Sequence, residues 1–326
     1  MPNSRIIGTG SYIPEKVLTN LDLEKMVETS DAWIVERTGI RERHVAADGE
    51  AASDMAAAAS RRALEMAGVR PEDLDVIIVG TISADMPMPS AAVLLQQKLG
   101  ASKAFAFDLS AACAGSIYGM GIADSFIATG RVRRALVVGV EVLTRILDWT
   151  DRNTCVLFGD AAGAMVLAPS DGPSGILSTH LHSDGAGAPA LYIPAGGSAR
   201  PTTEATVREK LHYVKMNGRE VYKIAVRSLT AVLGEAFATN RVTPDDVSHV
   251  IAHQANLRIL ESVLQRYAIP MSKCWVNLDK VGNTSSASLP MTLDQANRAG
   301  RLSRGDLIAM MAIGAGMAWG GALVRW

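Results

Sequence analysis

Residues 69–78 read VRPEDLDVII, and residues 242–251 read VTPDDVSHVI, 173 positions later. Both stretches follow an alanine-rich segment with helical spacing (56–67 and 226–238), and both lead into an apolar strand. A helix, a turn with Pro and Asp, and a buried strand together form a repeating element of α/β proteins. The repetition therefore predicts that the chain contains two copies of one folding unit.

Two further matches follow in the same order. Residues 130–134 (GRVRR) match 300–304 (GRLSR) at a shift of 170, and 159–167 (GDAAGAMVL) match 316–324 (GMAWGGALV) at a shift of 157. The shrinking shift predicts about a dozen extra residues in the first copy, around 143–154. Residues 183–214, rich in Gly, Pro, Thr and Ala, are expected to be an irregular connection between the halves.

Continuous apolar strands alternate with helical periods, at 76–79, 136–140 and 307–311. This pattern is typical of α/β sheets covered on both faces. We expect one half at 1–172 and the other at 173–326, related by a pseudo-twofold axis. Residues 307–324 carry no charge and contain a Gly-x-x-x-Gly motif, but glycines interrupt them. We interpret them as two buried strands joined by a turn rather than as a membrane span.

Composition excludes several classes of protein. The chain has 326 residues, 48% of them hydrophobic, which suits two domains or one fused two-part fold. Its 32 basic and 33 acidic residues give a net charge of −1, so the overall charge does not favour binding of nucleic acid. A local basic patch is compatible with this balance. Three widely spaced cysteines exclude a disulfide scaffold and a cysteine-rich zinc site. No secretory pattern is visible in residues 1–10, so we expect a cytoplasmic protein.

Cys113 follows a predicted strand (104–109) and precedes a helix of small residues (115–130). The helix dipole at such a turn favours thiolate, and the Cys113 N–H could help to hold an oxyanion. A lone cysteine is more often structural. However, a shift of 170 aligns Cys113 with Asn283, and His253 directly follows a strand of the second copy. Together, Cys, His and Asn on related turns favour nucleophilic catalysis.

Several motifs resemble those of β-ketoacyl-acyl carrier protein synthase III. They are AACAG at 111–115, HQANLRI at 253–259, GNTSSAS at 282–288 and DAWIVERTGIRER at 31–43. The resemblance runs from IIGTG at 6–10 to ALVR at 322–325, essentially the whole chain. It implies a thiolase-like fold, in which a duplicated βαβαβαββ unit forms five α-β-α-β-α layers. It also implies a homodimer.

The resemblance implies a two-stage reaction without a cofactor or metal. Cys113 would accept an acyl group from acyl-CoA, and a decarboxylative Claisen condensation with malonyl-acyl carrier protein would initiate fatty-acid synthesis. His253 and Asn283 would then donate hydrogen bonds to the enolate. The main-chain N–H groups of Cys113 and Ala315 would form a second oxyanion hole.

The resemblance also assigns binding residues. Trp33 and Arg152 correspond to the pair that stacks on the adenine of coenzyme A, and Thr29, Arg37 and Asn256 correspond to further contacts. Lys223 and Arg258 correspond to positions that dock the acidic carrier protein, although Gln265 stands where relatives have a lysine. We expect the nearby Arg266 to extend this basic patch.

The acyl pocket would be lined by Met88, Leu143 and Ile313, with Met88 reaching into the partner subunit's pocket. Because Met88 and Ile313 replace aromatic residues of the family, we expect primers longer than acetyl, or branched ones. Ala315 replaces a glycine of the family, and its methyl group would disturb the oxyanion hole if this position needed positive φ.

Other interpretations remain open at this stage. A papain-like hydrolase also uses Cys, His and Asn, but it needs no duplicated unit. A dinucleotide oxidoreductase would need a third glycine after Gly8 and Gly10, where the chain has Ile13. The strongest alternative is a related starter, quinolone or polyketide-type condensing enzyme or acyltransferase of secondary metabolism with the same triad.

Overall fold

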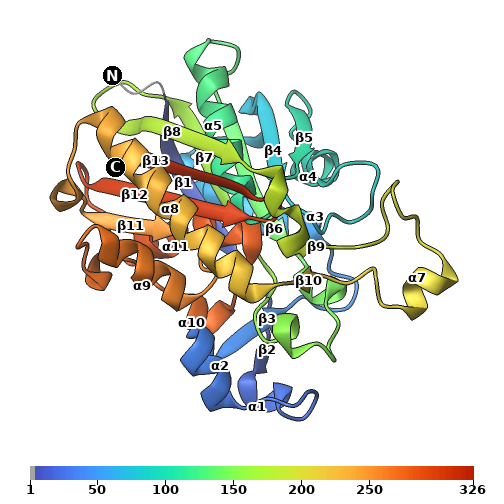
Figure 1. Ribbon diagram of the computed structural model, residues 1–326. Coiled ribbons are helices and arrows are strands. Elements are labelled where there is room, and N and C mark those ends of the chain that lie inside the picture. The colour runs from blue at the N-terminus through green and yellow to red at the C-terminus, as the bar shows by residue number, and fades with distance from the viewer. Residues whose placement is uncertain (1–3) are drawn as a thin grey trace.

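The computed structural model describes residues 4–326, so the first three residues of the expected N-terminal half lie outside it. Two mixed sheets and three layers of helices stack into five layers (Figure 1). This is the α-β-α-β-α arrangement that the family resemblance implied.

The first sheet has the strand order β1-β7-β6-β4-β5. Strands β4, β5 and β6 are parallel, whereas β7 runs antiparallel to β1 and β6. The bounds are β1 Ser4–Tyr12, β4 Val76–Gly80, β5 Phe105–Leu109, β6 Ala135–Glu141 and β7 Ala161–Pro169.

The second sheet repeats this order as β8-β13-β12-β11. Strands β11 and β12 are parallel, and β13 is antiparallel to β12 and β8. An isolated bridge between Val250 and Cys274 takes the place that β5 has in the first sheet. The predicted two copies are therefore confirmed. The bounds are β8 Gly175–Ser183, β11 His249–Ala252, β12 Leu307–Gly314 and β13 Ala318–Arg325.

Three pairs of helices form the other layers. Helices α3 and α4 cover the outer face of the first sheet, and α8 and α9 cover the outer face of the second. Helices α5 and α11 lie between the sheets, in a core made by both halves. The bounds are α3 Ala52–Ala67, α4 Ala91–Leu99, α5 Gly115–Ala128, α8 Gly218–Asn240, α9 Leu257–Arg266 and α11 Ser288–Arg298.

A smaller layer of short elements lies beside one end of the sheets (Figure 1). Strands β2 (Lys16–Thr19) and β3 (Glu42–Val45) form a hairpin-like pair that carries α1 (Asn20–Leu23) and α2 (Asp31–Thr38). Helix α6 (Arg152–Cys155) lies in the predicted insertion of the first copy, and α10 (Leu278–Val281) precedes Asn283.

The irregular segment 183–214 does not connect the halves, so that expectation was wrong. Strand β8 precedes it and already pairs with β13 of the second sheet. The segment is an insertion inside the second half, between β8 and α8. It contains β9 (Leu191–Tyr192) and α7 (Glu204–Arg208), and β10 (Lys215–Met216) follows it and pairs with β9. Figure 1 shows α7 standing apart from the layers.

The two central turns correct the predicted alignment of Cys113 with Asn283. The 3-10 turn η2 (Ala112–Ala114) begins at φ +46° and leads into α5, and η7 (Ser285–Ala287) begins at φ +49° and leads into α11. The shift at these turns is 173, so Cys113 is equivalent to Ser286. The shift becomes 170 only after the helices, because α11 has 11 residues and α5 has 14.

Glycines allow these turns to lie directly on the first sheet. A Cβ on Gly139 of β6 would lie 2.0 Å from the Ser286 carbonyl oxygen, and one on Gly80 of β4 would lie 2.7 Å from the main chain of Gly115. Side chains at these positions would separate the layers. The close approach places Cys113 at the seam between the halves.

The two strands predicted at 307–324 are confirmed as β12 and β13. Within residues 4–326, no helix has both the length and the hydropathy that crossing a bilayer requires.

Candidate active site

Cys113 lies in the turn η2, directly before α5, and is only 6% exposed. Burial raises the pKa of its thiol to about 12, against a smaller lowering by the Ser285 hydroxyl. We expected the helix dipole to favour thiolate, but desolvation dominates in the protein without ligand. Cys113 is therefore a thiol at neutral pH and must lose its proton during the reaction.

His253 directly follows β11 and is also buried. Its main-chain N–H donates to the Met311 carbonyl oxygen at 2.8 Å, which fixes the backbone against β12. Neither ring nitrogen has a hydrogen-bond partner among the described residues. Because burial lowers the pKa of His253 to about 3, the ring is neutral and keeps one N–H donor.

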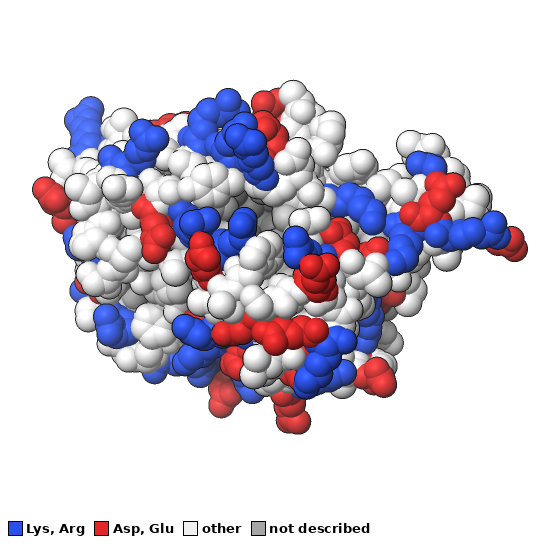
Figure 2. All heavy atoms as spheres, turned by 60° about the horizontal axis from the view of Figure 1, so that its bottom comes forward, with Lys and Arg blue, Asp and Glu red and all other residues white. Residues whose placement is uncertain are grey.

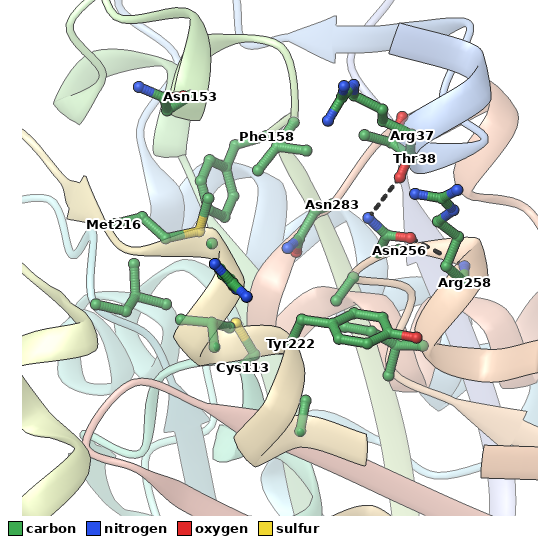
Figure 3. Close-up of a pocket in the computed structure, with 18 of the residues that line it drawn as sticks. Arg37, Thr38, Cys113, Asn153, Phe158, Met216, Tyr222, Asn256, Arg258 and Asn283 are labelled. Carbon is green, nitrogen blue, oxygen red and sulfur yellow. Dashed lines mark hydrogen bonds between the residues drawn. The ribbon is translucent and has the colours of Figure 1, made fainter. Parts of the chain in front are cut away.

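Asn283 is held by its main chain between α10 and η7. Its N–H donates to Leu157 at 2.8 Å, and its carbonyl accepts from Gly159 at 3.0 Å. The side-chain Oδ1 accepts a hydrogen bond from the Ser285 N–H at 2.9 Å. This bond identifies the other end of the amide as the Nδ2 donor, and Figure 3 shows Asn283 and Cys113 extending toward the same space.

One cavity of about 770 Å³ is lined by Cys113, His253 and Asn283. The three residues predicted to form the triad are thus brought together from both halves. Five cations line the same cavity, and no carboxylate of the described residues does: Arg37, Arg152, Arg219, Lys223 and Arg258. On the face shown in Figure 2, Lys and Arg side chains gather, with acidic side chains between them.

The residues predicted to bind coenzyme A lie mostly at this cavity. The guanidinium carbons of Arg37 and Arg152 lie 4.8 and 5.1 Å from the centre of the Trp33 ring. Asn256 caps α9 and donates from Nδ2 to the Arg37 carbonyl oxygen at 3.0 Å (Figure 3). Thr29 is not part of the lining, although its buried hydroxyl has no partner in residues 4–326.

A second cavity of about 200 Å³ also opens at Cys113 and is almost entirely apolar. Of the predicted acyl-pocket residues, Leu143 lines it, whereas Ile313 lines the larger cavity. Met88 lines neither cavity, and its side chain is 84% exposed. Much of the remaining wall escaped sequence analysis: Ile82, Phe158, Leu191, Tyr192, Ile193 and Val214.

Ala315 lines this second cavity in the turn between β12 and β13. Its φ is not in the left-handed region, which Gly316 adopts instead at φ +136°. The strain that we considered for a methyl group at position 315 therefore does not arise. The main chain passes close to the nucleophile here, because a Cβ on Gly314 would lie 2.4 Å from the Cys113 nitrogen.

The structure places two of the three predicted docking residues at the large cavity. Lys223 on α8 and Arg258 on α9 line the large cavity. Arg266 is the last residue of α9 and does not line it. Arg219, which also lines the cavity, adds a cation at the first turn of α8.

Sequence analysis missed Glu141 and Ser285, which lie beside Cys113. Glu141 ends β6 and is completely buried, and its carboxyl oxygens accept hydrogen bonds from the loop after β4 and from η7. The sequence did contain a signal for Glu141, because an acidic residue ends an apolar strand there. Carboxylates buried in a core are rare unless they have a structural or functional role.

Comparison with known proteins agrees with this geometry. Two family patterns match, 3-oxoacyl-[acyl-carrier-protein] synthase III at residues 107–185 and its C-terminal part at 237–326. A beta-ketoacyl-[acyl-carrier-protein] synthase III of Caldanaerobacter subterraneus is 50% identical, covering 98% of this chain and 97% of the relative. The chain belongs to the synthase III family.

Solved structures of proteins with similar sequences share the fold. The crystal structure of 3-oxoacyl-[acyl-carrier-protein] synthase III from Aquifex aeolicus is 45% identical and superimposes with a TM-score of 0.92, covering 99% of this chain and 100% of that chain. A priming beta-ketosynthase of the R1128 polyketide pathway is 35% identical, also with a TM-score of 0.92, over 99% of this chain and 96% of that chain.

The expected class of enzyme is confirmed. The chain is an acyl-transferring condensing enzyme of the type that initiates fatty-acid synthesis. Because relatives about 50% identical over the whole chain carry the synthase III name, the alternative in secondary metabolism is not favoured.

Proposed function

We propose that Cys113 takes an acyl group from acyl-CoA and passes it to the carbanion formed by decarboxylation of malonyl-acyl carrier protein. One observation carries this assignment: Cys113, His253 and Asn283, from both halves of the fold, line a single cavity whose only charged lining residues, in the described part of the chain, are cations. Both proposed substrates are anionic, so a cationic entrance suits them.

In the first stage, the Cys113 sulfur attacks the acyl thioester and the thiol of coenzyme A leaves. A thiolate is both a good nucleophile and a good leaving group, so one atom serves both stages. The main-chain N–H groups of Cys113 and Ala315 are the proposed donors to the carbonyl oxygen in this stage.

In the second stage, loss of carbon dioxide places negative charge on the thioester oxygen of the malonyl group. The neutral His253 ring and the Asn283 amide are both buried, and each offers an N–H to the large cavity. Fixed donors of this kind stabilise a developing oxyanion by about 3–4 kcal/mol each. We assign these two residues to the enolate.

Coenzyme A binding is proposed at Trp33 and its two arginines. The Arg152 guanidinium, now 5.1 Å from the indole centre, would move away from the ring so that a purine could stack between them, and the remaining cations could meet phosphates. Thr29 and Asn256 are proposed as further contacts.

The apolar cavity at Cys113 supports primers longer than acetyl. If each small group occupies about 30 Å³, a volume of about 200 Å³ holds roughly six non-hydrogen atoms. We therefore propose straight or branched primers of about four to eight carbons.

The second substrate is proposed to arrive on an acidic carrier protein that docks at Lys223 and Arg258, with Arg266 at the edge. We also propose a cytoplasmic homodimer. Strand β5 ends the first sheet with Phe105 half exposed, and Met88 is available to reach a partner's acyl pocket. Light scattering of the purified protein would test the dimer.

The function is tested by incubating purified enzyme with a panel of acyl-CoAs from two to twelve carbons, then with malonyl-acyl carrier protein, and measuring intact masses. We expect adducts on Cys113 and 3-oxoacyl products, with four- to eight-carbon primers favoured. Cys113→Ala should abolish the adduct, whereas Cys155→Ala, at a buried cysteine outside both cavities, should retain it. Acylation without a condensation product would contradict the assignment, and adducts from acetyl-CoA alone would contradict the primer proposal.

A further inference from the structure

Glu141 is a completely buried carboxyl group that joins the two halves of the fold. Its Oε2 accepts three hydrogen bonds from the loop after β4, in the first half. The donors are the hydroxyls of Thr81 at 3.2 Å and Ser83 at 2.5 Å and the Ile82 N–H at 3.1 Å. Its Oε1 accepts from the hydroxyls of Ser285 and Ser286, both at 3.0 Å, in the second half. Loss of the carboxyl group would therefore leave buried donors on both sides without their acceptor.

The side-chain amide of Asn283 is oriented by the main chain of Ser285. Asn283 Oδ1 accepts a hydrogen bond at 2.9 Å from the Ser285 N–H, two positions along the chain, as in an Asx turn. A carboxamide has one acceptor end and one donor end, so this bond leaves Nδ2 as the end available to the enolate. Rotation of the amide by half a turn would present Oδ1 instead, which repels an enolate oxygen.

The main chain of Asn283 is fixed by different bonds. Its N–H donates to the Leu157 carbonyl oxygen, and its own carbonyl oxygen accepts from Gly159. These two bonds determine where Asn283 lies, but they do not determine which end of its amide is directed to the enolate. Orientation of the amide thus depends on the Ser285 N–H.

Ser285 adopts a backbone conformation that residues with a Cβ rarely take. Its φ is +49°, in the left-handed region, which glycine adopts without strain and serine does not. The Ser285 hydroxyl is bonded to Glu141, and the Ser285 N–H is bonded to Asn283. Because both groups belong to one residue, the bond to Glu141 restrains the N–H that orients the amide.

We propose that Glu141 is a positioning residue for the second stage: through Ser285, it keeps Asn283 Nδ2 directed to the enolate oxygen. The inference rests on the proposed role of Asn283 as a donor to that oxygen. Glu141 lines neither of the cavities at Cys113, so it acts through Ser285 rather than on the substrate. Acylation does not use Asn283, so the effect of Glu141 should be confined to decarboxylation.

The first test compares the two stages in Glu141→Gln, which keeps the shape of the side chain but replaces one acceptor oxygen with a donor. Carbon dioxide release from malonyl-acyl carrier protein is measured with enzyme already acylated by butyryl-CoA, and acylation itself is measured by rapid quench and intact mass. We expect carbon dioxide release to slow by about tenfold, the scale of a misplaced catalytic group. The KM for malonyl-acyl carrier protein should not change, and acylation should slow by less than about threefold.

Ser286→Ala is the matched control for loss of a bond to Glu141. Ser286 donates to the same oxygen at the same distance, but the Asn283 amide is bonded to the N–H of Ser285. We expect both stages in this variant to stay within about threefold of wild type, since the orientation of Asn283 is kept.

A second test uses the left-handed conformation of Ser285. Ser285→Ala and Ser285→Gly both lose the hydroxyl, but only alanine also keeps the strain at φ +49°. Carbon dioxide release should slow by about tenfold in Ser285→Ala and stay within about threefold of wild type in Ser285→Gly. A simple packing defect would be at least as severe in the glycine variant, because glycine removes more atoms.

A double-mutant cycle shows whether Glu141 acts through Asn283. If it does, adding Glu141→Gln to Asn283→Ala should slow carbon dioxide release by less than about twofold further, because the amide is already absent. Independent action would instead multiply the two effects.

Four outcomes would overturn the positioning role: unchanged carbon dioxide release in Glu141→Gln, equal slowing of both stages in that variant, equal losses in the two Ser285 variants, or multiplied effects in the cycle. If Glu141→Gln fails to fold, the two Ser285 variants decide. Carbon dioxide release at the wild-type rate in Asn283→Ala would contradict the proposed function, and this inference with it. Multiplied effects alongside a slow Asn283→Ala would contradict the inference alone.

Discussion

At the residue scale, burial determines the protonation of His253. The pKa of its ring falls to about 3 in the folded protein, against about 6.5 in an unfolded chain. Between these values the unfolded chain binds a proton that the native state does not. The stability of the protein should therefore fall as pH drops from about 6.5 toward 3.

We predict that His253→Gln reduces this acid sensitivity. Between pH 7 and pH 4.5, wild type should lose about 2–3 kcal/mol of unfolding free energy through His253, and the variant should not. Urea unfolding of both proteins at the two pH values measures the difference. Equal losses in the two proteins would show that the imidazole is not held in its neutral form.

Asn283 should affect only the second stage. We expect Asn283→Ala to leave the acylation of Cys113 within about threefold of wild type, because its proposed contact is with the enolate. Decarboxylation of malonyl-acyl carrier protein should fall by about 100-fold or more through loss of one fixed donor. Carbon dioxide release and intact mass measure the two stages separately, and loss of acylation would contradict the assigned role.

At the scale of elements, the close contact of β6 with η7 depends on Gly139. A methyl group there would meet the Ser286 carbonyl oxygen at 2.0 Å, and the backbone cannot yield cheaply. We predict that Gly139→Ala lowers the free energy of unfolding by at least about 2 kcal/mol and impairs acylation, because η7 packs against the turn η2 that carries Cys113.

Gly172→Ala is the control for this substitution. A methyl group at position 172 would meet no atom within 4 Å, and its φ is not in the left-handed region. Its stability should stay within about 0.5 kcal/mol of wild type. Similar losses in both variants would show that close approach to Ser286 is not the cause.

Arg43 connects the small layer to the cavity wall. It is completely buried, and its guanidinium donates to the carbonyl oxygens of Leu18 and Val156 and to Asn20 Oδ1. Burial lowers the pKa of Arg43 to about 10, so it stays charged at neutral pH.

We predict that Arg43→Met costs at least about 2 kcal/mol, because three buried acceptors lose their donor. The KM for acyl-CoA should also rise, since β2, β3 and α2 carry Trp33. Arg43→Lys, which keeps one donor group, should be intermediate. A change in stability without a change in KM would limit Arg43 to a role in folding. Urea unfolding and acylation kinetics provide the two measurements.

At the scale of the whole molecule, a net charge of −1 conceals an uneven distribution. Five cationic side chains line the large cavity, and no carboxylate within residues 4–326 lines it. We predict that Lys223→Glu raises the KM for malonyl-acyl carrier protein by about five- to tenfold and weakens its dependence on salt. Acylation by acyl-CoA should change less than threefold.

Arg241→Glu is the control, at the opposite end of α8 and about 27 Å away along the helix. It makes the same change in net charge, so it should leave both kinetic constants nearly unchanged. Equal effects of the two substitutions would point to net charge rather than to a local docking surface. Steady-state kinetics at low and high salt provide the measurement.

Local sequence patterns predicted the duplicated unit, the strands at 307–324 and the turn that carries Cys113. The motifs around Cys113, His253 and Asn283 also pointed to residues that the fold brings into one cavity. These features depend on hydrophobic periodicity and turn residues, which act over a few positions and can be recognised without knowing the packing.

Only the tertiary structure decided how distant segments meet. It aligned Cys113 with Ser286 rather than with Asn283, because the shift changes inside α11 and no motif marks that change. It built the apolar cavity partly from 191–214, a segment whose composition predicts a linker. It also brought Glu141 into hydrogen-bond contact with Ser285, which lies 144 positions away in the sequence. Such contacts follow from the packing of whole layers, which residue patterns within a single element do not encode.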